Sequence, residues 1–293
     1  ALEPSRGVCA PPRSGGSIPA VSPTTPHLPA GCSWVRETPA AGPPALVHPR
    51  WAEGLPWLVQ GTTVRGDGPE PFDLGLFSDA SPARTVLAGW ERLRRDTGVL
   101  RVVHAHQVHG AAVRMHGAGL PGLCLAEPCD GHVTATALTL LAVTVADCVP
   151  VFVVDPHRRA VALLHAGWRG AAAGILERGL EVLGERLGSR AEALLVHLGP
   201  AICGSCYEVG PEVRSAALAV HGEAARPWFP EQEGRLVFDL WRANAEQLAA
   251  AGLAPGALEL AGICTICEDA HFHSWRREGA AAGRFAAGIG LSA

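Results

Sequence analysis

The sequence contains no lysine, so all 24 of its basic side chains are arginines. A lysine Schiff base and the lysine of a Walker-type phosphate loop are therefore excluded as the basis of any activity. A substrate anion would have to be bound by arginine or by backbone N–H groups. Methionine is almost absent as well, and Met115 is the single residue that could offer a thioether to a metal.

Long runs of one charge sign are also missing. The 28 acidic and 24 basic residues give a net charge of −4 and are spread along the chain. Proteins that bind nucleic acid or anionic membranes usually carry a basic patch. We therefore expect neither nucleic acid nor membrane among the partners.

The sequence does not start with the basic residues and the apolar run of about 7–15 residues that mark a secretory signal, so we expect a cytoplasmic protein. The longest apolar stretch is Val133–Val154, and a membrane span needs roughly 20 residues. Asp147 and Pro150 interrupt this stretch, and threonines recur along it. It predicts two buried strands joined by a functional turn.

Two regions differ in composition. Residues 1–45 contain 10 of the 24 prolines and show no apolar period, which predicts a mobile, Pro-rich N-terminal extension. Residues 46–293 have short apolar runs that alternate with helical stretches, without a repeat or a second boundary. We expect one packed domain over this second region.

Strands and helices are mixed along the predicted domain. Apolar and β-branched runs predict strands, and apolar residues spaced by three and four predict helices. The predicted strands are Trp57–Thr63, Leu100–Ala105, Ala112–Met115, Leu138–Ala146, Val151–Asp155, Ala160–His165, Ala193–Leu198 and Leu258–Ile263. The predicted helices are Ala83–Thr97, Ala171–Leu187, Glu212–Val220 and Leu240–Ala251. This order predicts a mixed α/β or α+β domain in which helices cover β-sheet.

Polar residues that could carry chemistry stand at the ends of three apolar runs. These segments are 104–110 (His-Ala-His-Gln-Val-His-Gly), 146–150 (Ala-Asp-Cys-Val-Pro) and 165–170 (His-Ala-Gly-Trp-Arg-Gly). Zinc and copper bind neutral imidazole and thiolate, and a set of His109, Cys148 and His165 would leave a coordination position open for water or substrate. Taken singly, such a cysteine is more often a small buried apolar residue, and such a histidine a hydrogen-bonded polar one.

The turn after His165 could bind an anion. Gly167 and Gly170 permit close approach of the backbone, a helix begins there, and Arg169 is available to pair with a phosphate. The alternative is a tight connection between strand and helix with an arginine on the surface.

Nine cysteines, an odd number, indicate reduced thiols or metal ligands rather than a disulfide framework. Cys203/Cys206 and Cys264/Cys267 form two Cys-x-x-Cys pairs that could build a tetrahedral zinc site. The 57 residues between the inner cysteines greatly exceed the spacing of compact zinc ribbons. Independent thiols are the simpler expectation, and metal binding by these pairs stays open.

The three segments together resemble the YfiH-type laccase-domain family, also called multicopper polyphenol oxidoreductases. The hallmarks of that family, Gln-Val-His-Gly, Ala-Asp-Cys-x-Pro-Val and His-Ala-Gly-Trp-Arg-Gly, stand here at 107–110, 146–151 and 165–170. Further matches lie at 199–210 and from Cys264 to Arg277. The early family segments are kept only loosely, at 61–66 and at 72–75, where Phe-Asp-Leu-Gly replaces Leu-Asn-Leu-Gly.

The resemblance implies a single layered domain with two central mixed β-sheets flanked by helices. It implies a purine nucleoside phosphorylase with adenosine deaminase activity, acting on a small nucleoside and phosphate. It assigns His109, Cys148 and His165 as metal ligands, with zinc as the expected metal and copper as the alternative. Arg169, Gly167 and Gly170 are the candidates for holding phosphate.

Such a reaction also needs a proton donor, and Asp147, Glu208 and Asp130 are the candidates. Two other interpretations stay open. A copper-dependent polyphenol oxidase would use the same ligands, although Met115 and two His-x-His pairs are few for a multicopper centre. A non-enzymatic protein with a structural zinc site would use the four paired cysteines. The oligomeric state is not readable from the sequence.

Overall fold

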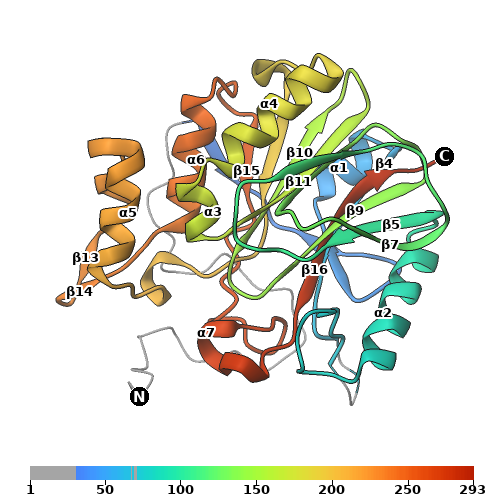
Figure 1. The fold of residues 1–293 in the computed structure, drawn as a ribbon, viewed down its shortest axis with the longest axis horizontal. Coiled ribbons are helices and arrows are strands. Elements are labelled where there is room, and N and C mark those ends of the chain that lie inside the picture. The colour runs from blue at the N-terminus through green and yellow to red at the C-terminus, as the bar shows by residue number, and fades with distance from the viewer. Residues whose placement is uncertain (1–30, 67, 69–70) are drawn as a thin grey trace.

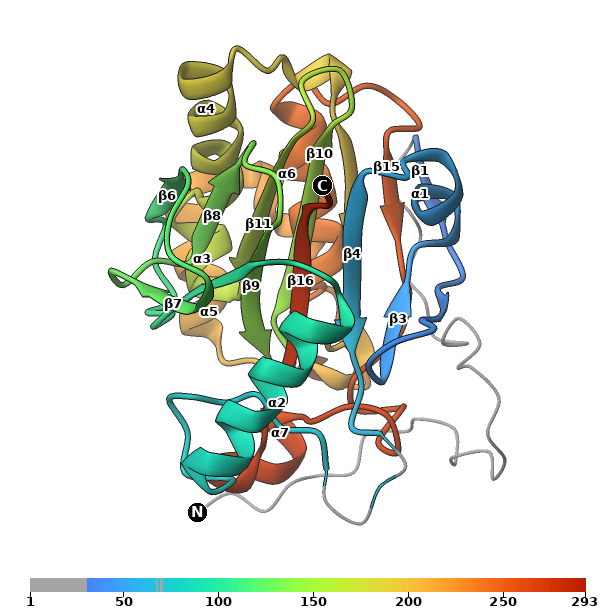
Figure 2. The ribbon, with the colours of Figure 1, turned by 90° about the vertical axis from the view of Figure 1, so that its right-hand side faces the viewer.

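The computed structural model describes residues 31–66, 68 and 71–293, which form two mixed seven-stranded β-sheets packed face to face (Figures 1 and 2). Helices cover the outer faces of both sheets. The predicted class, a mixed α/β domain with two central sheets flanked by helices, is confirmed.

Each sheet combines strands from distant parts of the chain. The first has the order β1 (Cys32–Trp34), β15 (Leu258–Leu260), β12 (Leu195–Leu198), β10 (Val149–Asp155), β11 (Ala160–Ala166), β8 (Gly131–Thr134) and β6 (Val113–His116). The second has the order β2 (Thr38–Pro39), β3 (Ala45–Val47), β4 (Leu58–Thr63), β16 (Phe285–Leu291), β9 (Thr139–Val145), β5 (Arg101–Ala105) and β7 (Gly122–Ala126). A separate hairpin joins β13 (Glu231–Gln232) and β14 (Arg235–Leu236).

The helices are fewer and mostly short. They are α1 (Pro49–Gly54), α2 (Ala83–Asp96), α3 (Trp168–Ala172), α4 (Ile175–Leu187), α5 (Pro211–His221), α6 (Leu240–Ala250) and α7 (Trp275–Glu278). The helices α3 to α6 lie on one side of the molecule, and α2 lies on the other (Figure 1). None of the helices in the described ranges combines the length and the apolar character that crossing a membrane requires.

Strand β10 shows why the central strands are apolar on both faces. Val151 and Val153 pack in the core beneath α4 and α6, whereas Phe152 and Val154 pack in the core between the two sheets. Because successive side chains point to opposite faces and both faces are covered, the strand has no polar alternation.

Strand β16, in the middle of the second sheet, was not predicted. It pairs with β4 and β9 along its length, and its sequence Phe-Ala-Ala-Gly-Ile-Gly-Leu contains four alanines and glycines, which disfavour a strand prediction. Close packing explains the small residues, since a Cβ atom at Gly290 would overlap the carbonyl group of Thr139.

The predicted helix Ala171–Leu187 is two helices. Helix α3 ends at Ala172, and Gly174 has a φ of 81°, a left-handed conformation that a continuous helix cannot contain. The regular apolar spacing concealed this break.

Residues 31–45 differ from the predicted extension. They contain β1, β2 and the start of β3, and Val35 and Glu37 are buried. Strands β1 and β2 are short edge strands, where proline is tolerated, so the composition of this segment resembles that of a loop. Residues 1–30 of the predicted extension lie outside the described residues.

Candidate active site

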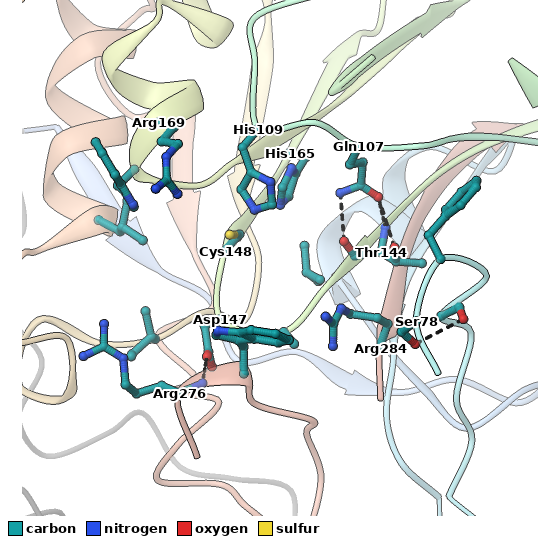
Figure 3. Close-up of a pocket in the computed structure, with 18 of the residues that line it drawn as sticks. Ser78, Gln107, His109, Thr144, Asp147, Cys148, His165, Arg169, Arg276 and Arg284 are labelled. Atoms are coloured by element: carbon teal, nitrogen blue, oxygen red, sulfur yellow. Dashed lines mark hydrogen bonds between the residues drawn. The ribbon is translucent and has the colours of Figure 1, made fainter. Parts of the chain in front are cut away.

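The three motif segments meet at one end of the sheet sandwich (Figure 3). His109 follows β5, Cys148 lies in the connection from β9 to β10, and His165 is near the end of β11. Since β9 and β10 belong to different sheets, the turn at Cys148 carries the chain from one sheet to the other. The sulfur and one ring nitrogen from each histidine lie within 4.8 Å of one another. We call these three residues the histidine–cysteine cluster.

The carboxylate of Asp130 holds two members of this cluster. Its Oδ1 accepts hydrogen bonds from the backbone N–H of His109, at 2.9 Å, and pairs with Nδ1 of His165, at 2.8 Å. Its Oδ2 accepts from the backbone N–H groups of Val108 and Gly110. Asp130 is fully buried, so these contacts fix the ring of His165 and leave Nε2 as the nitrogen available to a metal.

Two residues in or beside the cluster have strained backbone. His109 has a φ of 60° and Asp147 a φ of 98°, in a region that costs a residue with a side chain about 1–3 kcal/mol. The N–H contacts to Asp130 hold the first. The second is held by its own carboxylate, which accepts from the Thr265 hydroxyl and the Arg276 N–H, both at 2.7 Å. The surrounding contacts therefore determine where His109 and Cys148 lie.

Gly167 is required by close approach to the cluster. A Cβ atom at this position would lie 2.7 Å from the sulfur of Cys148 and 3.3 Å from the ring of His109. The glycine in the His-Ala-Gly-Trp-Arg-Gly segment therefore leaves room for the thiolate.

The cluster carries opposite charges when no metal is bound. Burial alone would raise the pKa of the Cys148 thiol, but the charge of His165 and hydrogen bonds from both histidines outweigh it and lower the pKa to about 6. Burial alone would lower the pKa of His165, but the thiolate and Asp130 raise it to about 9. At neutral pH the metal-free cluster thus holds a thiolate beside an imidazolium.

The donor set fits a zinc or copper ion. Thiolate and imidazole bind these metals at about 2.0–2.3 Å, and the spacing of the three donor atoms is compatible with one ion between them. The preformed thiolate and the carboxylate behind His165 are features that such sites use.

A cavity of about 410 Å³ lies directly against the cluster. Its wall carries three guanidinium groups and four aromatic rings. These are Arg169, Arg276, Arg284, Phe77, Trp168, Tyr207 and Trp275. Arg276 and Arg284 lie across the cavity from His109 (Figure 3). The cavity therefore combines apolar planes with a positive lining.

The three predicted proton donors occupy different environments. As far as the described residues define it, the lining of the cavity includes Asp147 but neither Asp130 nor Glu208. Asp130 is engaged behind His165, as described above. Glu208 is half-exposed, and its carboxylate lies 3.8 Å from the guanidinium of Arg235.

The predicted phosphate segment is only partly at the cavity. Arg169 lines it, with its guanidinium 4.4 Å from the ring centroid of Trp168. Gly167 precedes α3, and Gly170 is buried inside it. A helix begins at this turn as predicted, but it is the five-residue α3, and the longer helix α4 begins only at Ile175.

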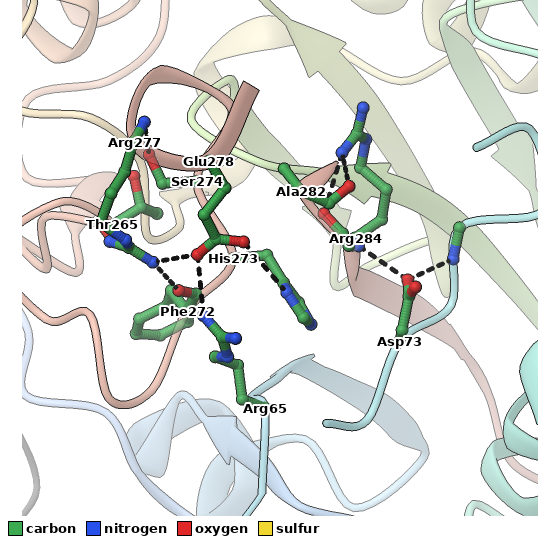
Figure 4. Close-up of polar contacts among 12 residues, drawn as sticks. Arg65, Asp73, Thr265, Phe272, His273, Ser274, Arg277, Glu278, Ala282 and Arg284 are labelled. Atoms are coloured by element: carbon green, nitrogen blue, oxygen red, sulfur yellow. Dashed lines mark hydrogen bonds and ion pairs between the residues drawn. The ribbon is translucent and has the colours of Figure 1, made fainter. Parts of the chain in front are cut away.

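Arg276 and Arg284 were not predicted as site residues. Arg276 lies in the family match from Cys264 to Arg277, which was a usable signal, whereas nothing in the local sequence distinguishes Arg284. Burial lowers the pKa of Arg284 from its usual range, and Asp73 partly offsets this effect. The backbone N–H of Arg284 donates to Asp73 at 2.8 Å (Figure 4), so the loosely kept Phe-Asp-Leu-Gly segment supports this wall.

The paired cysteines are also brought together. The sulfur atoms of Cys203, Cys206, Cys264 and Cys267 lie within 4.8 Å of one another, although independent thiols were the simpler expectation. We call these four residues the four-cysteine cluster.

Comparison with known proteins gives concordant matches. Residues 67–292 match the family described as multi-copper polyphenol oxidoreductase laccase. The purine nucleoside phosphorylase YlmD of Geobacillus stearothermophilus is 38% identical over 249 residues, which cover 79% of this chain and 89% of that protein. A purine nucleoside phosphorylase of Pseudomonas aeruginosa is 37% identical over 236 residues, covering 78% and 91%.

Solved structures share the fold. The crystal structure of the hypothetical protein YfiH from Bacillus licheniformis matches with a TM-score of 0.78 and 27% identity, over 86% of this chain and 98% of that one. The structure of YlmD from Geobacillus stearothermophilus matches with a TM-score of 0.75 and 29% identity, over 88% and 100%.

Proposed function

Because the chain belongs to the multi-copper polyphenol oxidoreductase laccase family, as its motifs predicted, we propose that it is a metal-dependent purine nucleoside phosphorylase. The observation that carries the proposal is the position of the histidine–cysteine cluster against a cavity lined by three arginines. The names of the relatives supply the substrate class, and the cavity supplies groups suited to it.

His109, Cys148 and His165 would hold the metal, which we expect to be zinc, with copper as the alternative. A bound ion of this kind supplies a Lewis acid that polarises a substrate oxygen or activates a water. Asp130 keeps His165 in the orientation and tautomer that binding needs.

The cavity suits a nucleoside and a phosphate together. Its volume of about 410 Å³ lies in the range of roughly 300–1,000 Å³ that small-molecule sites occupy. Aromatic rings in the wall can stack on a purine, and each guanidinium group can donate two parallel hydrogen bonds to phosphate oxygens. Arg169, Arg276 and Arg284 are the arginines that line it, so they are the proposed phosphate ligands.

In phosphorolysis the bond between C1′ of the ribose and N9 of the purine breaks, and a phosphate oxygen bonds to C1′. The leaving purine takes up a proton. Guanidinium groups stay protonated and cannot supply it. Dihydrogen phosphate loses a proton as its oxygen bonds to C1′, and we assign to Asp147, in the cavity wall, the relay of this proton to the purine, while Thr265 and Arg276 hold its carboxylate in place.

Deamination of adenosine is the second reaction that we propose for the same site. Water would replace phosphate as the nucleophile and attack C6 of the purine, and the C6 amino group would leave as ammonia. Asp147 would carry a proton from the attacking water to the departing amino group.

The test uses the purified full chain loaded with zinc. With phosphate and adenosine, inosine or guanosine, we expect release of the free base and ribose 1-phosphate, and formation of inosine from adenosine without phosphate, both followed by liquid chromatography. His165→Ala should lower kcat/KM at least about 100-fold. His157→Ala is the matched control, because this exposed histidine lies in the turn at the other end of the β10–β11 hairpin. The proposal fails if no base is released from any of the three nucleosides.

Copper-dependent phenol oxidation is the competing function, and the family description favours it. A multicopper centre needs several histidines around clustered ions. Within the described residues, the histidine–cysteine cluster is the one metal-capable group that contains histidine, and Met115 does not line the cavity. Oxygen uptake with a phenol after copper loading, together with an intense visible band, would favour oxidation.

A further inference from the structure

The two Cys-x-x-Cys pairs leave neighbouring strands in the same direction. Strands β12 and β15 are parallel partners in the first sheet, so the chain exits both at the same edge. Beyond the strands the two segments remain paired. The backbone N–H of Ala201 donates to the carbonyl oxygen of Ile263, and the N–H of Thr265 donates to the carbonyl oxygen of Ala201, both at 3.1 Å. The pairing of β12 with β15 therefore brings the two Cys-x-x-Cys pairs together despite the 57 residues between Cys206 and Cys264.

The spacing of the sulfur atoms suits a tetrahedral ion. Zinc–sulfur bonds of about 2.3 Å place the corners of a tetrahedron about 3.8 Å apart. The sulfurs of Cys206 and Cys267 are 3.7 Å apart, and all four lie within 4.8 Å of one another. A disulfide would require about 2.05 Å, so the two sulfurs lie at hydrogen-bond distance and are not joined by a disulfide.

The surroundings of the four sulfur atoms suit thiolates that are shielded from water. The backbone N–H of Cys203 points at the sulfur of Cys264, at 3.4 Å, and an N–H donor stabilises negative charge on sulfur. Cys203 and Cys264 are fully buried, whereas Cys206 and Cys267 are half-buried. Four protein ligands would leave no position for a substrate.

We propose that Cys203, Cys206, Cys264 and Cys267 bind one zinc ion in a closed, structural site that is separate from the histidine–cysteine cluster. The inference does not depend on the proposed function, because it concerns a second ion that makes no contact with substrate.

The ion would stabilise the wall of the cavity that the two cysteine segments support. Ile202 and Tyr207, on the first segment, line the cavity. On the second, the Thr265 hydroxyl bonds to Asp147, and the guanidinium of Arg277 donates to the carbonyls of Thr265 and Phe272, at 2.9 and 2.7 Å (Figure 4).

Helix α7, which carries Arg276, follows directly on this second segment. A crosslink between two segments 57 residues apart also lowers the entropy of the unfolded chain.

The experiment uses the full chain with His109→Ala and His165→Ala, which removes the other site. Expressed with zinc and purified under reducing conditions, this variant should retain about one zinc per chain, with four sulfur ligands at about 2.3 Å by X-ray absorption. Adding Cys206→Ser or Cys267→Ser should remove the zinc. Cys124→Ser, at a half-buried cysteine on β7, should not.

A second measurement covers the case in which the serine variants fail to fold. Removing zinc from the double-histidine variant with a chelator should lower Tm by about 5 °C or more and speed hydrogen exchange over residues 261–278, and zinc should reverse both. The proposal is overturned if the double-histidine variant holds no zinc, if nitrogen or oxygen replaces sulfur around it, if Cys206→Ser keeps it, or if peptide mapping shows a Cys206–Cys267 disulfide.

Discussion

The histidine–cysteine cluster and the four-cysteine cluster use similar donors in opposite settings. The first lies against the cavity, combines two imidazoles with one thiolate, and leaves a face open. The second lies beneath the cavity wall and would surround an ion completely. Because a metal reacts only where a ligand position is free, the same element would be catalytic in one place and structural in the other. The predictions below test this difference, from the largest expected effect to the smallest.

The pH dependence of metal binding should distinguish the first cluster most strongly. A metal needs the Cys148 thiolate, present above about pH 6, and neutral His165, present above about pH 9. Between these values binding releases one proton, so affinity should rise about tenfold per pH unit and level off above pH 9. Competition with a chelator of known pH dependence, in Cys206→Ser protein, measures this. A flat profile between pH 6 and 9 would contradict the charge states described here.

Asp130→Asn should weaken metal binding at the histidine–cysteine cluster about 10–100-fold, because the carboxylate that orients His165 is lost. Zinc at the four-cysteine cluster should be unchanged. Asp155→Asn is the matched control. This buried carboxylate also accepts backbone N–H groups, but at the other end of the β10–β11 hairpin. Equal losses of metal in both variants would show that general destabilisation, rather than orientation of His165, is responsible.

Gly167→Ala should lower metal affinity at the first cluster by about tenfold, since the added methyl group meets the sulfur of Cys148 at 2.7 Å and overpacking forces it to move. Gly117→Ala, where nothing lies within 4 Å of the added atom, should have no effect. Isothermal titration of metal-free protein with zinc measures both variants. Unchanged affinity at Gly167→Ala would mean that the thiolate is not the ligand.

Glu208→Gln should change kcat/KM less than about twofold, because surface charges interact weakly and this carboxylate lies outside the cavity lining. Steady-state kinetics with inosine and phosphate measures the effect. A loss of tenfold or more would restore Glu208 as a proton donor.

The sequence predicted most of the longer strands that contain β-branched residues, and central ones such as β10 have both faces covered by apolar layers. It could not predict β16, whose alanines and glycines are explained only by the backbones on either side of it. The break at Gly174 was concealed for a similar reason. Apolar spacing reports which face is buried and does not report a single left-handed residue.

Some residues of the candidate site also had a local signal in the sequence, and others did not. The ligand types of the histidine–cysteine cluster stand in three short motifs, so chemistry and family resemblance identified them in the sequence. Arg284 and the support from Asp73 depend on segments 211 residues apart and had no local signal. Asp130 was predicted as an acid, and its contacts show instead a carboxylate that is fully engaged behind His165.

The sequence by itself determined the kinds of donor atoms, the absence of lysine chemistry and the family, because these depend on residue identity and local order. Only the tertiary structure decided which donors share a point in space. The parallel pairing of β12 with β15 joins four cysteines that the linear spacing appeared to separate, and the crossing from β9 to β10 places Cys148 between two histidines. Sheet pairing connects residues without regard to their distance along the chain, and linear spacing cannot report it.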